Sequence, residues 1–375
     1  MSASPHNVCI TLGTRPEAIK LAPVIKQCQR SSRLKTHVIL TGQHREMVAQ
    51  VMNLFHLEAD QNLEIMQAEQ TLSDITCRSL KGLEKRFQEL QPRLVLVQGD
   101  TTTAFAATLA AFYQQIPTGH VEAGLRSYHL YNPYPEEANR RLIAQLAQLN
   151  FAPTPAAVQN LENSGVIGEI HLTGNTVIDA LLTMAERHPP CDIPGLDWTS
   201  YRVLLVTVHR RENWGEPLSD IIKGLQLILD QFPDTAVLLP LHRNPTVRNP
   251  IKTALGEHPR VFLTEPLDYS QLVGAMQRCY LLLTDSGGLQ EEAPSLGKPV
   301  LVLRHNTERT EAVTAGTAKL VGTNPQNIFQ GASELLKNQE VYQGMAMAIN
   351  PFGDGQAANR ILEIIERYLG NEAPQ

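Results

Sequence analysis

Short runs of β-branched and aliphatic residues alternate with amphipathic helical stretches along the whole 375-residue chain. The runs are apolar with little alternation, as in parallel strands that helices cover on both faces. They lie at 8–12, 37–40, 94–97 and 120–121 in the first half, and at 203–208, 236–239, 261–263, 280–284 and 300–303 in the second. This pattern predicts an α/β protein made of two doubly wound halves.

Helical spacing between these strands supports the same interpretation. Apolar residues from Leu72 to Leu90 recur at about that spacing before Pro92, and a second stripe runs from Leu218 to Phe232. The segment 188–200, HPPCDIPGLDWTS, is rich in Pro and turn formers, which predicts an interdomain or early second-domain loop. The length favours two domains, with one or three still possible.

Composition narrows the classes of function. With 38 acidic and 32 basic side chains the net charge is −6, which argues against general affinity for nucleic acid or anionic membrane. The five cysteines are widely spread without paired spacing, so neither structural zinc nor a disulfide framework is expected, and no metal-ligand cluster is visible. The amino terminus lacks the pattern of a secretory signal and no apolar run is long enough to span a membrane, so we expect a cytoplasmic protein.

Ligands of open parallel sheets bind beyond the carboxyl ends of the strands, so the residues that follow each strand are the candidates. The first strand leads into Gly13-Thr14-Arg15-Pro16-Glu17, with Lys20 one turn later. Free N–H groups at this helix start, together with Arg15 and Lys20, predict an anion site. A capped helix with surface cations is the alternative. The segment matches neither a dinucleotide fingerprint nor a P-loop.

Three carboxylates follow strands of the same sheet. Asp100 comes after 94–97, Glu122 after 120–121, and Glu136 opens a helix beyond a proline-bearing loop. Asp100 could simply be an N-cap, and either Glu136 or Glu137 could serve the helix dipole alone. Three carboxylates at one sheet edge would repel one another, however, and proton-transfer chemistry explains such a group better than stability does.

The second half supplies positive charge at the corresponding places. Strand 203–208 leads to His209, which in such a position is more often structural than catalytic, and strand 280–284 leads to Asp285-Ser286-Gly287-Gly288. Glycines at a strand-to-helix turn let backbone N–H groups approach an anion. Arg304 and Arg309 follow the next strand. The residues alone therefore predict a phosphorylated ligand and acid–base chemistry.

Several motifs together resemble the non-hydrolysing UDP-N-acetylglucosamine 2-epimerases over residues 7 to about 368. They are GTRPEAIKLAP, GDTTT, HVEAGLR, PEEANRR, HRREN, TDSGGLQEEAPSLGKPVL, NTERTEAV and NPFGDGQAANRI. The resemblance implies a GT-B-like fold, with two Rossmann-type domains facing a central cleft and a last helix that crosses back to the first domain. We expect the domains at 1–173, completed by 355–375, and at 174–354. The implied reaction is reversible C2 epimerisation of UDP-GlcNAc and UDP-ManNAc, without a cofactor or metal.

The resemblance also implies roles for individual residues. Asp100, Glu122 and Glu136 match carboxylates regarded as catalytic. His209 matches a position that holds the diphosphate of UDP, and we place it in the catalytic group. The other implied substrate-binding residues are Arg15, Lys20, Ser286, Gly287, Gly288, Glu292 and Arg309, of which Glu292 matches the position that contacts the ribose.

Many bacterial members of this family use UDP-GlcNAc as an activator at a second site. The matching positions, besides Glu136, are Gln43, His44, Gln70, Arg210 and His242. Glu46 and Glu69 stand where several activated members carry Gln and Arg, and two acidic side chains near a diphosphate would weaken binding. The resemblance also implies a homodimer, and retention of the intermediate predicts domain closure on UDP binding.

Other functions remain compatible with the fold. A GT-B glycosyltransferase or a hydrolysing epimerase would act on the same nucleotide sugar, although the three matching carboxylates favour neither. A UDP-sugar-binding regulator without activity is an alternative of a different class, and the intact acid–base positions count against it.

Overall fold

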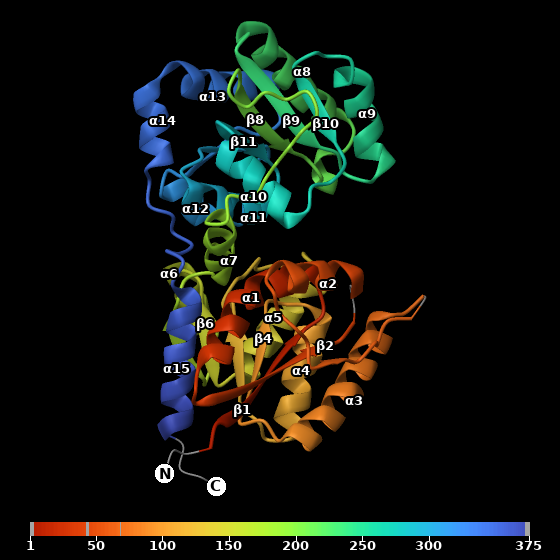
Figure 1. The fold of residues 1–375 in the computed structure, drawn as a ribbon, viewed down its shortest axis with the longest axis vertical. Helices are drawn as coiled ribbons and strands as arrows, with labels where there is room; N and C mark the ends of the chain where they lie inside the picture. The colour runs from red at the N-terminus through yellow and green to blue at the C-terminus, as the bar shows by residue number, and fades with distance from the viewer. Residues whose placement is uncertain (1–3, 43–44, 68, 372–375) are drawn as a thin grey trace. The chain divides into compact units, whose positions relative to one another are not determined.

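The structure is a computed structural model that describes residues 4–42, 45–67 and 69–371 (Figure 1). The chain forms two compact units. The first comprises Met1–Ala180 and Phe352–Gln375, and the second comprises Leu181–Pro351. The domain boundaries expected from the resemblance, at 173/174 and 354/355, remain predictions, and the two compact units divide at 180/181 and 351/352.

The first unit contains a parallel sheet of seven strands in the order β3-β2-β1-β4-β5-β6-β7. The strands are β1 (His6–Leu12), β2 (Leu34–Leu40), β3 (Gln61–Asn62), β4 (Leu94–Gln98), β5 (Thr118–Val121), β6 (Leu149–Ala152) and β7 (Glu169–Leu172). The helices are α1 (Arg15–Arg30), α2 (Arg45–Leu54), α3 (Leu72–Leu90), α4 (Thr102–Tyr113), α5 (Glu136–Leu146), α6 (Pro155–Asn163), α7 (Thr176–Ala185), which continues into the second unit, and α15 (Ala357–Asn371).

The second unit repeats this architecture with six parallel strands in the order β10-β9-β8-β11-β12-β13. The strands are β8 (Arg202–Thr207), β9 (Thr235–Pro240), β10 (Val261–Thr264), β11 (Leu281–Thr284), β12 (Val300–Val302) and β13 (Ala318–Leu320). The helices are α8 (Glu216–Gln231), α9 (Pro245–Leu255), α10 (Tyr269–Arg278), α11 (Gly287–Glu292), α12 (Thr310–Thr314), α13 (Pro325–Lys337) and α14 (Gln339–Ala346), with short 3₁₀ turns η1 (Arg211–Asn213) and η2 (Ala293–Leu296).

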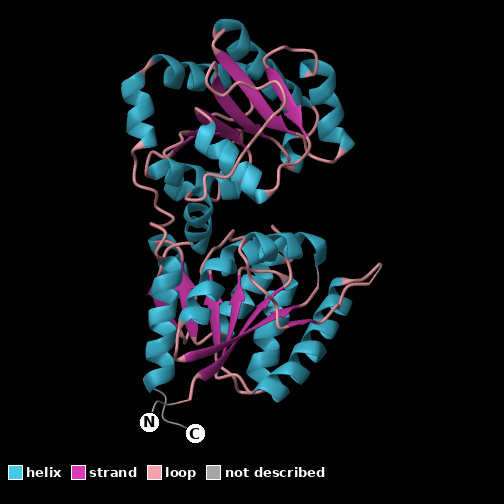
Figure 2. Cartoon of the chain, viewed as in Figure 1, coloured by secondary structure: helices cyan, strands magenta, loops and turns pink. Residues whose placement is uncertain are grey.

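Helices cover both faces of each sheet, which explains why the strands read as continuous apolar runs (Figure 2). In the first unit Val95 and Val97 pack with Leu83 and Phe87 of α3. In the second, the stripe of α8 packs on strand residues such as Leu204 and Val206. The expected fold class, two Rossmann-like halves of GT-B type, is therefore confirmed.

The order of strands reverses direction between β1 and β4 in the first sheet, and between β8 and β11 in the second. At such a switch point the following loops diverge to opposite faces of the sheet and leave a crevice for ligands. The residues after β1 and β4, and after β8 and β11, are therefore the ones that each fold brings to its ligand-binding edge.

The last helix completes the first unit. The chain re-enters that unit at Phe352, and α15 packs against α1 (Figure 1). Its buried stripe consists of Ala358, Ile361, Ile365 and Leu369. The last helix thus belongs to the first unit, as the resemblance implied. In the described part of the chain, no helix is both long and apolar enough to cross a lipid bilayer.

Candidate functional site

The turn after β1, where the sequence predicted an anion site with a capped helix as the alternative, forms a capped helix start. Glu17 turns back on the helix start, where its Oε2 accepts hydrogen bonds from the backbone N–H groups of Gly13, at 3.1 Å, and Thr14, at 2.7 Å. These donors are satisfied within the turn because Thr14 and Glu17 form a capping box. Lys20 is also engaged, since its Nζ lies 2.6 Å from Oε1 and 2.7 Å from Oε2 of Glu122.

Glu17 also ties this turn to the loop after β4. Its Oε1 accepts a hydrogen bond of 2.8 Å from the hydroxyl of Thr101, which follows Asp100 directly. Only 1% of Glu17 is exposed, and this burial raises the pKa of its carboxyl even though four hydrogen bonds act in the opposite direction. A buried carboxyl group thus joins the two loops at the switch point.

Asp100 is not an N-cap. Thr101 caps α4 instead, with its side chain accepting from the N–H of Ala104 at 3.0 Å. The Asp100 carboxylate faces α5, where Arg140 donates to its Oδ2 from Nε, at 3.0 Å, and from Nη2. Asn139 holds the backbone of the same residue through a 2.9 Å bond to the Asp100 carbonyl. The helix that begins at Glu136 therefore fixes the position of Asp100.

Glu122 follows β5 in a left-handed conformation, with φ of +64°, and is 8% exposed. Besides Lys20, the side-chain amide of Gln98 donates to its Oε2, and the amide of Asn175 donates to its Oε1 at 3.1 Å. Donors thus reach both carboxylate oxygens. A cation and two amide groups therefore surround this nearly buried carboxylate.

The two glutamates that open α5 differ in surroundings. Glu137 is completely buried and accepts from the N–H of Ser127 at 2.9 Å, from Arg140 at 3.3 Å and from Arg141 at 2.8 Å. Burial alone would raise the pKa of Glu137, but these donors hold it below its ordinary value. Glu137 is thus the structural residue. Glu136 has a buried Oε2 with no hydrogen-bond partner among the described residues.

The three carboxylates therefore do not simply repel one another. Asp100 pairs with Arg140, and Glu122 pairs with Lys20, so positive charge lies beside both acidic groups. Asp100 and Glu136 are linked through α5, whereas Glu122 is linked to α1. The sequence pattern identified the acidic residues but not their cationic partners.

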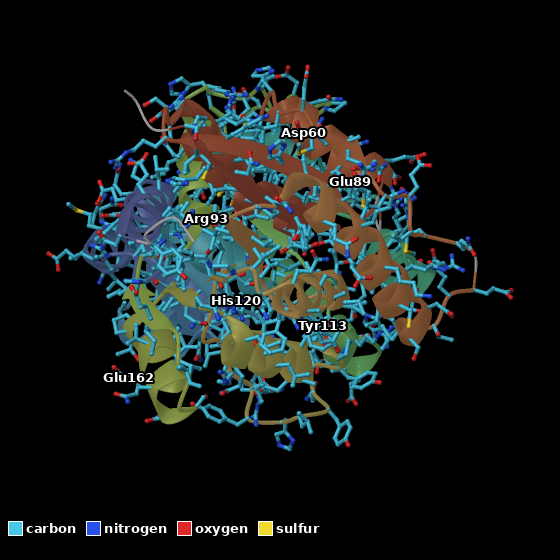
Figure 3. All side chains as sticks on the ribbon, turned by 90° about the horizontal axis from the view of Figure 1, so that it is seen from below. Asp60, Glu89, Arg93, Tyr113, His120 and Glu162 are labelled. Atoms are coloured by element: carbon cyan, nitrogen blue, oxygen red, sulfur yellow. The ribbon has the colours of Figure 1, made fainter. Side chains whose placement is uncertain are left out.

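His120 supports the loop that carries Asp100. It is completely buried, and Figure 3 shows it inside the first unit, whereas Glu162 of α6 lies at the edge of the view. The Nε2 of His120 lies 2.7 Å from the carbonyl oxygen of Gly99. Because a carbonyl oxygen can only accept, this nitrogen carries the proton and donates. Burial lowers the pKa of His120 to about 4, which keeps the ring neutral.

The switch point of the second unit has a corresponding buried carboxylate. Asp285, after β11, accepts at Oδ2 from the backbone N–H groups of His209, at 2.9 Å, and Arg210, at 2.8 Å, and from the amide of Asn213 at 3.0 Å. Its Oδ1 lies 3.0 Å from Nδ1 of His209. Burial would raise the pKa of Asp285, but the contact with His209 and the two N–H groups keep it low.

This contact orients the His209 ring. The side chain of His209 remains 40% exposed although its partner is completely buried, and its ring stacks on His242 with centroids 6.4 Å apart. An aspartate at Nδ1 favours a proton on that nitrogen, which leaves Nε2 on the opposite side of the ring. His209 can therefore act either as a donor to an anion or as an acid–base group.

Two guanidinium groups lie beside the start of α11. A Cβ added to Gly287 would lie 3.4 Å from Cζ of Arg309 and 3.6 Å from Nη2 of Arg210, so the glycine lets both cations approach the backbone. Arg309 is fixed by a 2.6 Å bond from its Nε to Glu291, and the Nε of Arg210 is buried without a partner among the described residues. Fixed guanidinium groups next to backbone N–H groups suit a phosphate.

Glu292 and Arg304 complete this part of the second unit. Glu292 accepts from the hydroxyl of Tyr269 at 3.1 Å and is 7% exposed. Arg304, which the sequence suggested as a further cation for the ligand, is instead buried between Glu212 and Glu308. Contact with Arg304 lowers the pKa of Glu308 to about 2, so this group is a structural ion pair.

The two surface hollows seen over the described residues lie away from the candidate site residues. One surface hollow lies between α5 and α6 beside Arg126 and Arg141, and another lies beside Trp198 and Arg278. Neither is lined by any of the residues that the sequence selected. Within the described ranges, no three His, Cys, Asp or Glu side chains are grouped so that they could hold a metal ion.

Comparison with known proteins decides the family. The family model described as UDP-N-acetylglucosamine 2-epimerase matches residues 26–366. The chain belongs to the UDP-N-acetylglucosamine 2-epimerase family.

Individual members of this family match over almost their full length. The Escherichia coli K12 UDP-N-acetylglucosamine 2-epimerase is 48% identical over 96% of this chain and 98% of its own. The Bacillus subtilis 168 enzyme of the same name is 46% identical, with 98% and 97% covered. The crystal structure of the UDP-GlcNAc 2-epimerase from Neisseria meningitidis bound to UDP-GlcNAc has 46% identity and a TM-score of 0.85, and covers 96% of this chain and 100% of that chain.

The proposed activator residues of this epimerase family member are only partly described. Gln43 and His44 lie outside the described residues. Gln70, in the first unit, is engaged with its own loop, accepting from the N–H of Gln67 at 2.7 Å and donating to the Ile65 carbonyl at 2.8 Å. Arg210 and His242 lie in the second unit, where His242 faces the His209 ring.

Several site residues were missed by sequence reasoning. Glu17, Gln98 and Asn175 each hold a loop or a carboxylate, yet each looks like an ordinary polar residue of a helix start, a strand end or a turn. Arg140 is the exception that a pattern could have found. It lies one helical turn from Glu136 on the same helix, where i,i+4 neighbours share a face.

Proposed function

We propose that the chain catalyses the reversible epimerisation at C2 that interconverts UDP-GlcNAc and UDP-ManNAc. The observation that carries this proposal is the match of 46–48% identity over nearly the whole chain to enzymes named UDP-N-acetylglucosamine 2-epimerase. A member bound to UDP-GlcNAc has the same fold, with a TM-score of 0.85. The three candidate carboxylates are present, which also favours an active enzyme over a binding protein.

In this proposal the second unit binds UDP. Arg210 and Arg309 lie beside the glycine that opens α11, and they would neutralise the diphosphate. Ser286 and Gly288 flank that glycine, and Glu292 would contact the ribose. His209, oriented by Asp285, would complete the group of donors aimed at the leaving diphosphate.

The chemistry of the sugar explains why binding of the diphosphate by these donors matters for catalysis. The hydrogen on C2 is not next to a carbonyl group, so a carboxylate cannot easily remove it from the intact substrate. Departure of UDP from C1 leads, positive charge develops at C1, and C2–H becomes acidic. Loss of that proton then forms the C1–C2 double bond of 2-acetamidoglucal. Donors aimed at the developing charge of the leaving group are worth about 10²–10³ each in rate.

The reverse steps give the epimer. A proton returns to the opposite face of C2, and the diphosphate oxygen adds back to C1, so no net oxidation or hydrolysis occurs. Because both faces of C2 must be served, at least two acid–base groups are required, each worth about 10²–10⁴. Asp100, Glu122 and Glu136 are the proposed groups. The Oε2 of Glu136, which has no hydrogen-bond partner in the described part of the chain, favours a direct role for this residue in proton transfer.

The test is incubation with UDP-GlcNAc in D₂O, followed by NMR at C2 and by mass spectrometry. We expect deuterium at C2 in both sugar nucleotides while the total amount of UDP-sugar stays constant. Release of free ManNAc with UDP would indicate hydrolysis, and turnover only with an added acceptor would indicate glycosyl transfer. Binding of UDP-GlcNAc without exchange at C2 would indicate a regulator. Each of these results would overturn the proposal.

We further propose that UDP-GlcNAc acts at most weakly as an activator. Glu46 and Glu69 are both exposed, so their charges lie at the surface beside the segment expected to bind it. We expect UDP-ManNAc to be turned over with hyperbolic kinetics in the absence of UDP-GlcNAc. A lag or a sigmoidal dependence that added UDP-GlcNAc abolishes would contradict this.

A homodimer is the proposed assembly. Phe112 and Tyr113 at the end of α4 are 52% and 61% exposed, and Leu142 on α5 is 49% exposed, which leaves apolar surface on the first unit for a second copy. Light scattering coupled to size-exclusion chromatography measures the mass directly. A mass of one chain across the working concentration range would exclude the dimer.

A further inference from the structure

Asn175 lies between β7 and α7 and is nearly inaccessible, with 2% of its surface exposed. Its side-chain Oδ1 accepts a 3.1 Å hydrogen bond from the N–H of Val177. That bond fixes the orientation of the amide, because the backbone group can only donate. The amide nitrogen must therefore face the other way, and it donates to Oε1 of Glu122 at 3.1 Å.

This bond complements the contacts that Glu122 makes elsewhere. Lys20 approaches both oxygens from α1, and Gln98 approaches Oε2 from the end of β4. Asn175 adds a neutral donor from a different segment of the chain. Because it supplies no charge, its contribution is to the orientation of the Glu122 carboxylate. It restricts the rotation of a carboxylate whose backbone is already in a left-handed conformation.

The backbone of Asn175 makes a second connection. Its N–H donates to the carbonyl oxygen of Phe352 at 2.7 Å, where the chain re-enters the first unit. A Cβ on Gly353, which has φ of +144°, would lie 3.3 Å from the Asn175 nitrogen. The departing and returning segments therefore pack backbone to backbone at this residue.

We propose that Asn175 is a positioning residue that aims the Glu122 carboxylate and ties its orientation to the point where the chain re-enters the first unit. The proposal rests on the proposed function, in which Glu122 acts at C2 of the sugar. The proposed role of Asn175 is to act through Glu122 and not on the substrate directly.

Three substitutions test this role. Asn175→Ser is too short to reach Glu122 but retains an oxygen for the N–H of Val177, and Asn175→Ala removes both bonds. We expect each to lower kcat by roughly 10- to 100-fold, the value of a hydrogen bond to a charged group, with little change in KM. Asn175→Asp keeps the bond to Val177 but places negative charge beside Glu122. The acid limb of its kcat/KM profile should move to higher pH, because a neighbouring negative charge makes Glu122 easier to protonate.

The matched control is Asp179→Asn in α7, the helix that follows Asn175. Asp179 accepts from the N–H groups of Ala357 and Ala358, so it also holds the returning segment, but it has no bond to Glu122. Its substitution should leave kcat and the pH profile unchanged. Thermal unfolding of every variant, followed by circular dichroism, shows whether a loss of rate accompanies a loss of structure.

A double-mutant cycle with Glu122→Gln tests whether Asn175 acts through Glu122. If Asn175 acts through Glu122, Asn175→Ser should have no further effect on kcat in the Glu122→Gln background. Equal losses in both backgrounds, or a folded Asn175→Ser variant with the parent rate, would overturn the inference. A Glu122→Gln enzyme with the parent rate would instead overturn the proposed role of Glu122, so the two failures can be told apart.

Discussion

At the scale of single residues, the two units share one structural feature. A buried carboxyl group joins the loops that follow the two central strands, Glu17 in the first unit and Asp285 in the second. Each accepts from backbone N–H groups and from a polar side chain. These bonds fix loop backbone that carries Asp100 and His209, which is what a preorganised site requires.

The ion pair between Asp100 and Arg140 gives the first prediction. Replacing Arg140 by Lys keeps the charge but loses the two donors that hold Oδ2, because an ammonium group cannot reproduce the fork of a guanidinium. We expect kcat to fall by about 10- to 100-fold through misplacement of Asp100.

Arg141→Lys is the matched control, because Arg141 contacts Glu137 and not Asp100. Steady-state assays of both variants provide the comparison. Comparable losses in the two would show that Arg140 acts through the stability of α5 rather than through Asp100.

The buried carboxyl group of Asp179 gives a prediction about pH. Burial raises its pKa from 3.8 to about 6, more than the hydrogen bonds from Ala357 and Ala358 lower it. Between these values the folded chain keeps a proton that the unfolded chain releases. The free energy of unfolding should therefore fall as the pH rises from about 4 to about 6, by about 3 kcal/mol.

Asp179→Asn cannot titrate, so that fall should be absent from it. Denaturation midpoints of the variant and the parent, measured at several pH values, give the difference directly. The difference should increase in favour of the variant over this range. A difference that is constant with pH would mean that Asp179 is ionised in the folded protein throughout.

At the scale of elements, close approach between a loop and a helix limits which residues the sequence can tolerate. Gly124, after β5, has φ of +92°, and a Cβ there would lie 2.3 Å from the backbone oxygen of Ala157 in α6. Gly165 also has a positive φ, +61°, but a Cβ there would meet nothing within 4 Å. A substitution at Gly165 therefore introduces backbone strain alone, whereas one at Gly124 introduces backbone strain together with steric overlap.

We expect Gly165→Ala to cost about 1 kcal/mol of stability from strain alone. Gly124→Ala should cost about 1–3 kcal/mol more, because α6 must move. The thermal midpoints of the two variants test the ordering. Equal midpoints would show that the loop after β5 relaxes at no cost.

The elements differ in how well the sequence specified them. The helix expected from Leu72 to Leu90 is confirmed with those bounds, since Thr71 caps it and Gln91 ends it in a left-handed conformation. The strands that the sequence predicted are confirmed to within a few residues. By contrast β3, β6, β7 and β13 were not predicted. Of these, β3, β7 and β13 are edge strands, which only pairing with a neighbour defines, whereas β6 lies inside the sheet as a buried run of only four residues.

The site shows the same division. Residues that follow central strands could be found by position, so Asp100, Glu122 and His209 were identified from the sequence. Asn175 could not be assigned in that way, because its importance comes from a contact between distant segments. Arg140 could have been found only from its spacing to Glu136, and not from its contact with Asp100. At Gly13 and Thr14 the sequence left an anion site and a capped helix open, and the structure shows the cap. Glu17 satisfies those donors, and a capping glutamate looks the same whether or not a ligand competes for them.

At the scale of the whole molecule, the first unit depends on both ends of the chain. Ile365 of α15 is completely buried, and the Ser31 hydroxyl after α1 donates to Glu366 at 2.5 Å. We expect Ile365→Ala to destabilise the first unit by about 2–5 kcal/mol. The transition of the second unit should be unchanged, because α15 belongs wholly to the first.

Calorimetry of the parent and the variant tests this expectation. Ile349, which is 87% exposed in the second unit, supplies the control, since Ile349→Ala should move neither transition. A single transition that shifts as a whole in Ile365→Ala would show instead that the two units unfold cooperatively.

The return of the chain at Phe352 has a consequence for biosynthesis. Ribosomes deliver a polypeptide from its amino terminus, and domains usually acquire their structure in that order. Here the segment Leu181–Pro351 has emerged completely while Met1–Ala180 still awaits its final helix. Until α15 has been synthesised, the nascent protein exposes an apolar stripe on α1. The first unit, although it is synthesised first, is therefore the last to complete its fold and the one most in need of a chaperone.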